Sequence, residues 1–510
     1  MVRARVLGVS GLGAAIALLV CACNGPNLDG LRFACQTSSD CGGGFVCQGN
    51  PRECVAAERN NNGVYDDRLV LGMSAAITEG LSALAPVGQQ AVRGFLAYFD
   101  KVNVAGGVEG RRIEVRVEED EYKPSLTREK AEYLIGGSPR LVFALVGVLG
   151  SANALAAAKL ATDNKVLLFA PGSGADELEE DPPARYVFNV RARYSEEAEQ
   201  LTHYALGTLR VPPQNIAVFG QGQSEFAGTS GAKELDAFGA SGRRGVIQAL
   251  KSQQIEEGAV LATSYNASNA NASRAIGEIL RWMARPAAEG GRVAGPGGDI
   301  PTGVVVAALP NAAASFICGL ESDFAEITSG RTPTSWPAPP PSEAEISQLK
   351  QVKTRRYLAL SPVGIALKEI FSIYCGAKAS AAAKTVIATT VPDPMGSSAA
   401  AVLDFRADQA AYFTRHDTET PEAVRTATIS SPIALEGYLS AKLLVAALRR
   451  HGRDLTTESF IDTLETLSAD VGIGAPFAFS PASHQATNHL YAVEIQDDLS
   501  LRPLGLLTRE

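Results

Sequence analysis

Two short turns contain the residues whose types and spacing are best suited to chemistry: residues 147–151 and 171–174. Each turn follows a nearly apolar run that is typical of a buried parallel strand. Serine hydroxyls and backbone N–H groups at the carboxyl ends of such strands can hold a polar group, and a helix that begins at Ser151 adds a partial positive charge. The turns predict half of a small-molecule site, although two ordinary strand-to-helix turns would have the same sequence.

The residues that catalysis would require are not grouped in this sequence. The five histidines are widely scattered without an H-E-x-x-H pair, and neither a G-x-S-x-G motif nor a Walker P-loop occurs. The run Gly220-Gln-Gly222 begins a G-x-G-x-x-G pattern without completing it, so we interpret it as a turn near the site. Ser151 has no base near it in sequence and is better suited to donating a hydrogen bond than to nucleophilic attack. We expect no enzyme, no cofactor and no metal.

The composition is that of a globular protein with more than one domain. The chain has 510 residues, of which 46% are hydrophobic and 20% charged, and its length favours two or three domains. The net charge is −9 and there is no block of basic residues, which argues against nucleic acid as a partner.

The first residues have the pattern of an export signal. Two arginines precede an apolar run over 6–20, which predicts a signal peptide over residues 1–22. A cysteine at the cleavage point resembles the bacterial lipoprotein signal, and Cys23 fits the lipidated position better than Cys21, which follows a bulky valine. No later run reaches 18 uninterrupted apolar residues. We therefore expect the membrane to be reached through a lipid anchor alone.

A cysteine-rich linker is predicted over residues 23–67. Its four closely spaced cysteines favour two disulfides, with three possible connectivities, over a zinc site, because the spacings lack a zinc knuckle and no histidine is near. These cysteines are Cys35, Cys41, Cys47 and Cys54. Further along, Cys318 and Cys375 lie in two helical patterns and could pair or remain two buried thiols.

From residue 68 onward the chain alternates strand and helix patterns. A short apolar strand near 69–73 precedes an amphipathic helix over 89–102, and a half-exposed strand follows at 113–117. A second helix and the strands on either side of residue 151 continue the series. Repeated units of this kind predict an α/β fold with a doubly wound parallel sheet and right-handed crossovers.

Several segments in order resemble the leucine/isoleucine/valine-binding family of type I periplasmic binding proteins, which serve ABC importers. The segments 100–111 (DKVNVAGGVEGR), 119–122 (EDEY) and 146–151 (VGVLGS) carry the resemblance, and 186–191 (YVFNVR) and 216–219 (IAVF) fall where the family expects them. So does the helix that starts with Gly437-Tyr438. The resemblance implies the type I periplasmic binding fold: two doubly wound parallel-sheet lobes joined by three crossovers.

The resemblance also implies how the chain divides. The first lobe would comprise residues 68–192 plus 385–479, and the second lobe residues 193–384 plus 480–510. Two segments exceed what that scaffold needs, 287–301 and 329–341. Both are rich in proline or glycine and predict surface loops that join no sheet.

Ligand contacts follow from the resemblance for the first lobe and the first crossover. Ser151 matches the family serine at a helix start, and Gly172 matches a position that contributes backbone groups. Gly174 stands where the family often has a threonine, so Ser173 would have to replace that hydroxyl. The implied contacts here are Val87, Ser151, Ala152, Gly172, Ser173 and Tyr194.

The second lobe departs from the amino-acid-binding pattern. Its implied contacts are Gln223, Pro310, Asn311 and Val363. Amino-acid binders place an aromatic residue and a carboxylate in this lobe, and the carboxylate takes the ligand's ammonium group. The matching segments, 310–311 and 362–364, supply no negative charge. A buried ammonium without an acceptor costs several kcal/mol, so we expect an amino-acid-like compound, a small acid, an amide or an aromatic compound rather than a free α-amino acid.

The combined prediction is a lipid-anchored, periplasm-facing solute-binding protein of an ABC importer of the branched-chain amino acid type. It would capture one small polar molecule and present it to an ABC permease. A ligand sensor or an orphan binding lipoprotein is the alternative, because the fold alone does not separate transport from sensing.

Overall fold

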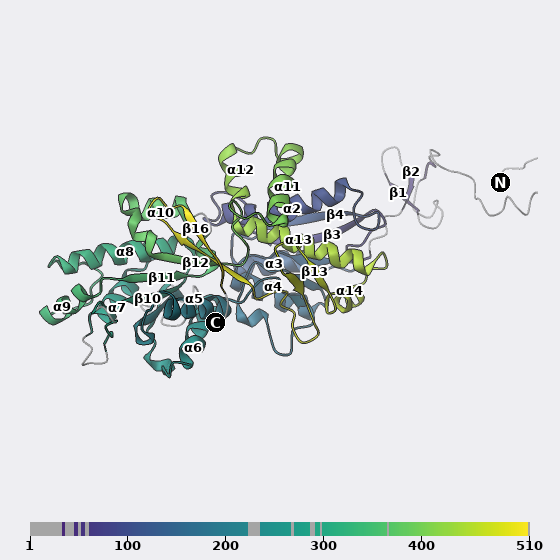
Figure 1. Ribbon diagram of the computed structural model, residues 1–510. Helices are drawn as coiled ribbons and strands as arrows, with labels where there is room; N and C mark the ends of the chain where they lie inside the picture. Colours follow the sequence, from purple (N-terminus) through teal and green to yellow (C-terminus); the bar gives the residue numbers. More distant parts are fainter. Residues whose placement is uncertain are drawn as a thin grey trace, which may run out of the picture. The chain divides into compact units, whose positions relative to one another are not determined.

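The computed structural model describes most of the chain (Figure 1). The described residues are 33–35, 45–48, 53–56, 61–222, 235–266, 270–285, 291–295, 298–364 and 367–507. The chain divides into two units, Met1–Arg59 and Asn60–Glu510.

In the first unit, β1 (Phe45–Gln48) pairs antiparallel with β2 (Glu53–Ala56). Cys35 and Cys54 are each disulfide-bonded, which agrees with the prediction of disulfides for this region. Cys47 lies on β1, opposite Cys54 on β2. The predicted signal peptide, both candidate lipidation sites (Cys21 and Cys23) and Cys41 lie outside the described residues.

The first lobe of the second unit is built on a five-stranded parallel sheet in the order β4-β3-β5-β6-β7. Its strands are β3 (Arg68–Ala75), β4 (Arg112–Glu119), β5 (Ala144–Val146), β6 (Leu167–Phe169) and β7 (Val187–Phe188). Residues of β3 alternate between the two faces: Leu69, Leu71 and Met73 pack into one core cluster and Val70 packs into the other. Both faces are therefore covered, as the apolar strand patterns predicted.

Helices cover each face of this sheet. One cluster contains α2 (Ala85–Val104), α11 (Ala400–His416), α13 (Pro432–His451) and α14 (Thr457–Leu464); the other contains α3 (Pro124–Ile135) and α4 (Ser151–Asp163). The lobe also contains α12 (Glu422–Ile429) and the hairpin of β13 (Ser468–Asp470) and β14 (Pro476–Ala478).

Helices α2 and α13 approach each other so closely that glycine is required at the contact. A Cβ atom on Gly94 would lie 2.0 Å from the carbonyl oxygen of Ala434, and one on Gly437 would lie 2.8 Å from that of Ala91. Neither clash could be relieved without moving backbone. This approach fixes the position of the first turns of α13, which reach the site described below.

The second lobe is built on a seven-stranded sheet in the order β16-β15-β12-β11-β10-β8-β9. Its parallel strands are β8 (Ile216–Gly222), β9 (Ala262–Asn266), β10 (Thr302–Ala307), β11 (Arg355–Ala359) and β12 (Thr385–Thr389). Two antiparallel strands, β15 (Leu490–Ile495) and β16 (Leu501–Leu507), extend one edge.

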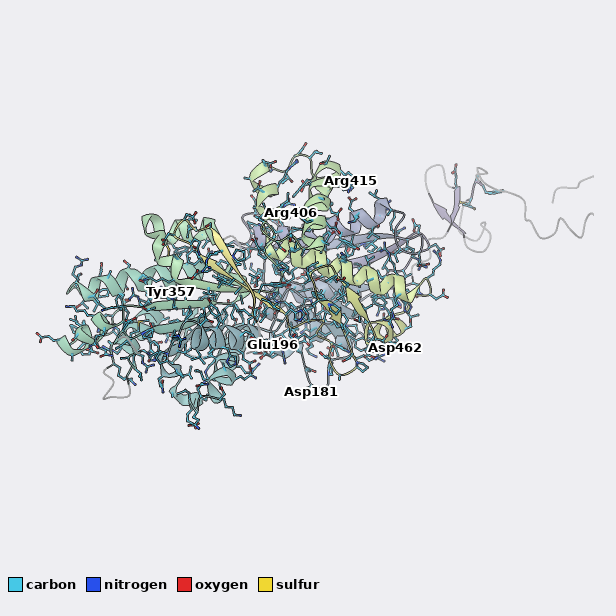
Figure 2. The ribbon with its side chains drawn as sticks, in the orientation of Figure 1. Asp181, Glu196, Tyr357, Arg406, Arg415 and Asp462 are labelled. Carbon is cyan, nitrogen blue, oxygen red and sulfur yellow. A yellow bond between two sulfur atoms is a disulfide. The ribbon has the colours of Figure 1, made fainter. Side chains whose placement is uncertain are left out.

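Helices also cover both faces of the second sheet (Figure 1). One face carries α5 (Tyr194–Gly207) and α6 (Ala237–Lys251), and the other carries α7 (Ser273–Ala284), α8 (Pro310–Thr328), α9 (Glu343–Gln351) and α10 (Leu367–Cys375). A disulfide joins Cys318 on α8 to Cys375 on α10, so these two cysteines are paired. Tyr357, labelled in Figure 2, is fully buried on β11 and its hydroxyl donates to Glu321 at 2.7 Å.

One predicted boundary is wrong. We placed residues 385–389 at the start of the returning first-lobe segment, but β12 pairs with β11 and β15 in the second sheet. The physical reason is that all five residues are buried, as they would be in a central strand of either sheet. The chain therefore returns to the first lobe after residue 389.

The predicted surface loop 329–341 contains no strand, but it is not wholly at the surface, because Trp336 packs into the second-lobe core. In the described part of 287–301 there is likewise no regular element. Among the described residues no single helix is long and apolar enough to span a membrane; α12 and α13 pass that test together only as a pair bent by 63°.

Three crossovers connect the lobes, after β7, β12 and β14. The first and third run beside each other, because Asn189 N donates to the carbonyl oxygen of His484 at 2.8 Å and Ala486 N donates to that of Asn189 at 2.8 Å. The side chain of Gln485 also donates to Glu196 at 2.6 Å. These bonds tie two of the three connections together.

Candidate ligand-binding site

A cleft between the two sheets is lined by residues of both lobes and of the crossovers. It contains about 770 Å³ of space free of atoms, a volume that includes its opening to solvent. Much of its wall is apolar. The first lobe contributes Leu84, Val87 and Leu149, and the second lobe contributes Phe238, Leu309 and Pro310.

The first polar feature of the cleft is the start of α4. Gly150 precedes the helix with φ +95°, a conformation that favours glycine, and no side chain caps the first N–H groups. Ser173 donates its hydroxyl hydrogen to Ser151 Oγ at 3.0 Å. Because Ser151 accepts that bond, its own hydroxyl hydrogen remains available to the cleft. The start of α4 therefore offers hydrogen-bond donors and a partial positive charge.

Tyr122 reaches the cleft from a strained turn. Glu121 and Tyr122 both have positive φ, +51° and +59°. Two carboxylates hold this conformation: Glu119 accepts from the backbone N–H of Glu121 at 2.7 Å, and Asp120 accepts from that of Tyr122 at 2.9 Å. The strain costs on the order of 1–3 kcal/mol per residue and is sustained by these bonds.

Tyr122 and Tyr194 both line the cleft, and burial raises the pKa of each hydroxyl above its usual value. Both phenols are therefore protonated at neutral pH. The Tyr194 hydroxyl oxygen accepts a hydrogen bond from the backbone N–H of Gly174, whereas the Tyr122 hydroxyl has no hydrogen-bond partner among the described residues. Each can donate a hydrogen bond to a bound molecule.

The second lobe contributes an amide relay, which we define as Gln221, Asp236 and Tyr265. Gln221 lies on β8 and lines the cleft. Its Nε2 donates to Asp236 Oδ2 at 2.7 Å, and the Tyr265 hydroxyl donates to its Oε1 at 2.7 Å. Asp236 also caps α6 by accepting from Gly239 N at 3.0 Å. The side chain of Gln221 is thus held from both ends of its amide.

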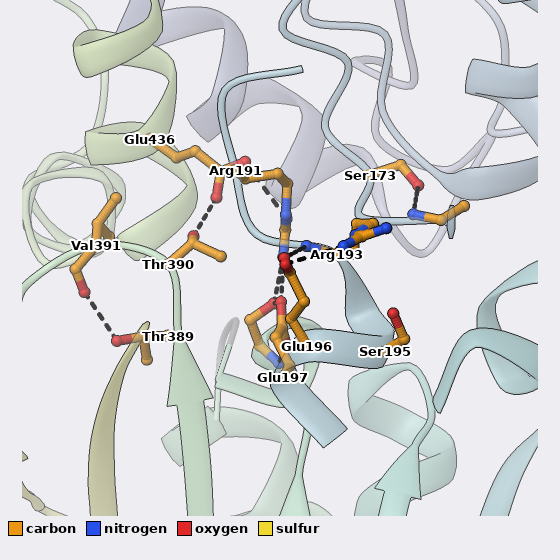
Figure 3. Close-up of polar contacts among 12 residues, drawn as sticks. Ser173, Arg191, Arg193, Ser195, Glu196, Glu197, Thr389, Thr390, Val391 and Glu436 are labelled. Carbon is orange, nitrogen blue, oxygen red and sulfur yellow. Dashed lines mark hydrogen bonds and ion pairs between the residues drawn. The ribbon is translucent and has the colours of Figure 1, made fainter. Parts of the chain in front are cut away.

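The hinge cluster is defined as Arg191, Glu197, Ser361, Thr390 and Glu436, of which all but Glu197 line the cleft. Figure 3 shows the contacts of Arg191, Glu197, Thr390 and Glu436. Arg191 is 4% exposed and lies between two carboxylates, at 2.7 Å from Glu197 Oε1 and 3.3 Å from Glu436 Oε1. Thr390 donates to Glu436 at 2.5 Å. Glu197 accepts hydrogen bonds from both the backbone N–H and the hydroxyl of Ser361, at 2.8 and 2.9 Å.

This cluster joins both lobes and two crossovers. Arg191 belongs to the first crossover and Thr390 to the second, while Glu197 lies on α5 and Glu436 on α13. Burial works against the charge of Arg191, but Glu436 and Glu197 keep its pKa above the usual value. All the carboxylate oxygens of the cluster accept hydrogen bonds or ion pairs from within it.

The structure brings five of the predicted contact residues together in the cleft: Val87, Ser151, Gly172, Tyr194 and Pro310. Four others do not line it: Ala152, Ser173, Asn311 and Val363. Ser173 supports Ser151 from behind, and Val363 is fully buried. Gln223 lies outside the described residues.

Sequence reasoning did not single out several polar residues that line the cleft, notably Arg191, Gln221 and Glu436. Gln221 lies inside the turn that was noted after a strand, and Arg191 ends the segment 186–191. We expected no negative charge from the second lobe, and positions 310–311 and 362–364 supply none. However, a carboxylate does enter the cleft from the first lobe, as Glu436.

The chain is similar to known periplasmic binding proteins in sequence and in fold. The family model described as periplasmic binding protein matches residues 71–281 and 370–499. No curated protein matches. Among solved structures, a possible leucine/isoleucine/valine-binding protein from Rhodopirellula baltica SH 1 has 22% identity and a TM-score of 0.64, covering 88% of this chain and 98% of that one.

Two further solved structures show the same fold with a ligand named. The solute-binding protein of an ABC transporter from R. palustris, in complex with benzoate, has 16% identity and a TM-score of 0.60, covering 86% of this chain and 96% of that one. A branched-chain amino acid ABC transporter protein from Thermus thermophilus with bound valine has 15% identity and a TM-score of 0.62, covering 87% and 97%. The fold is therefore the type I periplasmic binding fold.

Proposed function

Because the chain belongs to the periplasmic binding protein family, we propose that it is an extracytoplasmic solute-binding protein that closes its two lobes over one small molecule. The cleft between the sheets is the binding site. Capture would desolvate the ligand and give a closed form that a partner can recognise.

The observation that carries this proposal is that one cleft is lined by both lobes and by two crossovers. A ligand that contacts Ser151 in the first lobe and Gln221 in the second stabilises the arrangement in which both contacts are made. Binding and lobe closure are then the same event, which suits a protein that must signal whether it is loaded.

The chemistry of the walls supports a small organic acid as the ligand. The start of α4 offers donors and a partial positive charge to a carboxylate, and the apolar side chains on both lobes suit a hydrocarbon body. Benzoate and valine, which the two structural neighbours hold, both combine a carboxylate with an apolar group.

Delivery to an ABC permease is part of the proposal. Two of the structural neighbours are described as ABC transporter proteins. Lipidation at Cys23 would hold the protein at the membrane near such a permease. Cells that lack this chain should then take up the ligand more slowly, and a Cys23→Ala variant should be released from the membrane fraction.

A thermal-shift screen of the mature protein tests the binding step, using benzoate, short-chain fatty acids, 2-oxo acids, leucine and valine. A ligand at 100 times its dissociation constant should add about 2.7 kcal/mol to the free energy of unfolding. Ser151→Ala should then weaken binding of the hit about tenfold or more, since it removes a hydrogen bond to a charged group.

Asn311→Ala is the matched control, because Asn311 lies beside Pro310 without lining the cleft. It should leave affinity unchanged. If no carboxylate stabilises the protein, or if Ser151→Ala binds as tightly as the wild type, the proposed ligand site is wrong.

A further inference from the structure

The amide relay presents the side-chain amide of Gln221 to the cleft. Gln221 stands near the end of β8, with Leu309 and Pro310 beside it on the cleft wall. Its amide could offer the ligand a carbonyl oxygen or an N–H group. Which of the two it offers decides the charge and hydrogen-bonding type of the ligand that fits there.

One end of the amide is fixed by Tyr265. The backbone N–H of Leu309 donates to the Tyr265 hydroxyl oxygen at 3.0 Å. Because that oxygen already accepts, the phenol directs its own hydrogen to Gln221, whose Oε1 lies 2.7 Å away. The amide oxygen is therefore used within the protein.

The other end is fixed by Asp236. An ionised carboxylate can only accept hydrogen bonds, so it must face the amide nitrogen, which lies 2.7 Å from it. Burial raises the pKa of Asp236 to about 6, which leaves the group ionised at neutral pH. Two independent constraints thus give the amide the same orientation.

One N–H of the Gln221 amide remains available to a ligand. Asp236 uses one of the two hydrogens on Nε2, and the second has no partner within the described ranges. Tyr122 of the first lobe lies close enough to interact electrostatically with Asp236 and with Tyr194 on α5, so two further phenol donors lie near the relay. This part of the cleft is rich in hydrogen-bond donors.

An ammonium group would find no free acceptor of comparable strength. Among the described residues that line the cleft, Glu436 is the sole carboxylate. Its two oxygens are engaged by Arg191 and Thr390, and a ligand cation placed there would also face the guanidinium group of Arg191. A buried ammonium in this cleft would be poorly compensated.

We propose that the ligand is a small carboxylic acid whose second polar group is an uncharged acceptor, such as the carbonyl oxygen of a 2-oxo acid. The free N–H of Gln221 donates a hydrogen bond to that acceptor. The proposal rests on the proposed function, in which the start of α4 holds the carboxylate. It assigns specificity between keto and amino compounds to the amide relay.

Matched ligand pairs test it, because each pair shares a carbon skeleton and differs in the group at carbon 2. The pairs are 4-methyl-2-oxopentanoate with leucine, 3-methyl-2-oxobutanoate with valine, and phenylpyruvate with phenylalanine. Titration calorimetry at pH 7.5 should give the 2-oxo acid at least about tenfold higher affinity in every pair that binds. An amino acid that binds as tightly as its 2-oxo partner overturns the inference but leaves the proposed function standing. A panel in which no carboxylate binds overturns both.

Variants then show which residue distinguishes the 2-oxo acid from the amino acid. Gln221→Leu should lower affinity for the 2-oxo acid about tenfold and change affinity for the amino acid little, so the ratio of the two falls. Ser151→Ala should lower both affinities together. Because the ratio is taken within one variant, a partly unfolded preparation does not alter it.

Tyr265→Phe is the second variant, since it leaves Gln221 in place but frees one end of its amide. We expect the ratio to fall less than in Gln221→Leu. Gln253→Leu, on the exposed turn after α6, is the surface control and should change nothing. If the ratio of the two affinities stays at the wild-type value in Gln221→Leu, the relay does not distinguish the 2-oxo acid from the amino acid.

Discussion

The hinge cluster and the amide relay both contribute residues to the same cleft but use their polar groups in opposite ways. The hinge cluster holds one arginine between two glutamates, and its members form hydrogen bonds and ion pairs with one another. The amide relay contains one carboxylate and leaves an N–H of Gln221 without a partner among the described residues.

The difference separates two tasks. Buried charges are costly unless they are paired, so a cluster whose charges satisfy one another is suited to fixing the geometry of the crossovers. A neutral group held in one orientation costs little to bury and can still discriminate between ligands. We infer that charge sets the hinge in this protein while an amide sets the specificity.

The largest effect is expected from breaking the hinge cluster. Glu197→Ala removes the carboxylate that pairs with Arg191 at 2.7 Å and accepts both bonds from Ser361. It leaves the buried guanidinium of Arg191 with one carboxylate partner instead of two. We expect the free energy of unfolding to fall by about 3–5 kcal/mol, measured as the shift of the urea midpoint.

The exposed pair of Glu257 with Arg243 provides the control. Their side chains are 61% and 31% exposed, and the pair spans 2.6 Å. Glu257→Ala should cost less than about 1 kcal/mol. If Glu197→Ala costs no more than this control, the hinge cluster does not hold the crossovers.

A smaller effect should come from Glu179, a carboxylate that lacks the pairing seen in the hinge cluster. Its Oε1 is buried with no hydrogen-bond partner among the described residues, and burial raises its pKa to about 8. The folded state therefore binds this proton more tightly than the unfolded state does. The resulting stability is fully present below about pH 4.5 and is lost as the pH rises through about 8.

Glu179→Gln mimics the protonated form and should remove that loss. At pH 9 we expect the variant to unfold with a free energy higher than wild type by on the order of 1–3 kcal/mol, and at pH 4 with no difference. Urea titrations at the two pH values provide the measurement. Equal stability at pH 9 would mean that the carboxylate of Glu179 is well solvated.

The fold was largely predictable from the sequence because its evidence is local. Apolar runs and amphipathic helices alternate at the spacing of a doubly wound sheet, and the order of segments such as 100–111 and 146–151 matched the family. The strand over 385–389 was assigned to the wrong lobe, because a fully buried run does not specify which sheet it joins. Strand pairing is a long-range property.

The site was harder to predict for the same reason. Arg191 and Glu436 are 245 positions apart in sequence, and they meet because the fold brings α13 beside the first crossover. Gln223 was predicted as a contact and lies outside the described residues, whereas Gln221, which the sequence marked only as part of a turn, lines the cleft. Ser151 was predictable because a helix start after a strand has a local signature.

The smallest effect we predict concerns the charge that orients the amide relay. Asp236 faces Gln221 and caps α6, and Glu177, Tyr122 and Tyr265 are near enough to interact with it electrostatically. Below its pKa of about 6 the neutral carboxyl group gains a hydroxyl donor, which can face the amide oxygen as well as the amide nitrogen. One of the two constraints on Gln221 is then lost.

The preference for a 2-oxo acid over its amino acid should therefore fall several-fold between pH 7.5 and pH 5, as measured by calorimetry with the same matched pair. The carboxylates of both ligands stay ionised over this range, so their own titration does not produce the change. Asp236→Asn should lower the preference at pH 7.5 and make it independent of pH, because its amide can serve Gln221 in either orientation. If the preference of the wild type is the same at both pH values, Tyr265 alone orients the amide. The contrast with the hinge cluster would then be complete, since charge would have no part in reading the ligand.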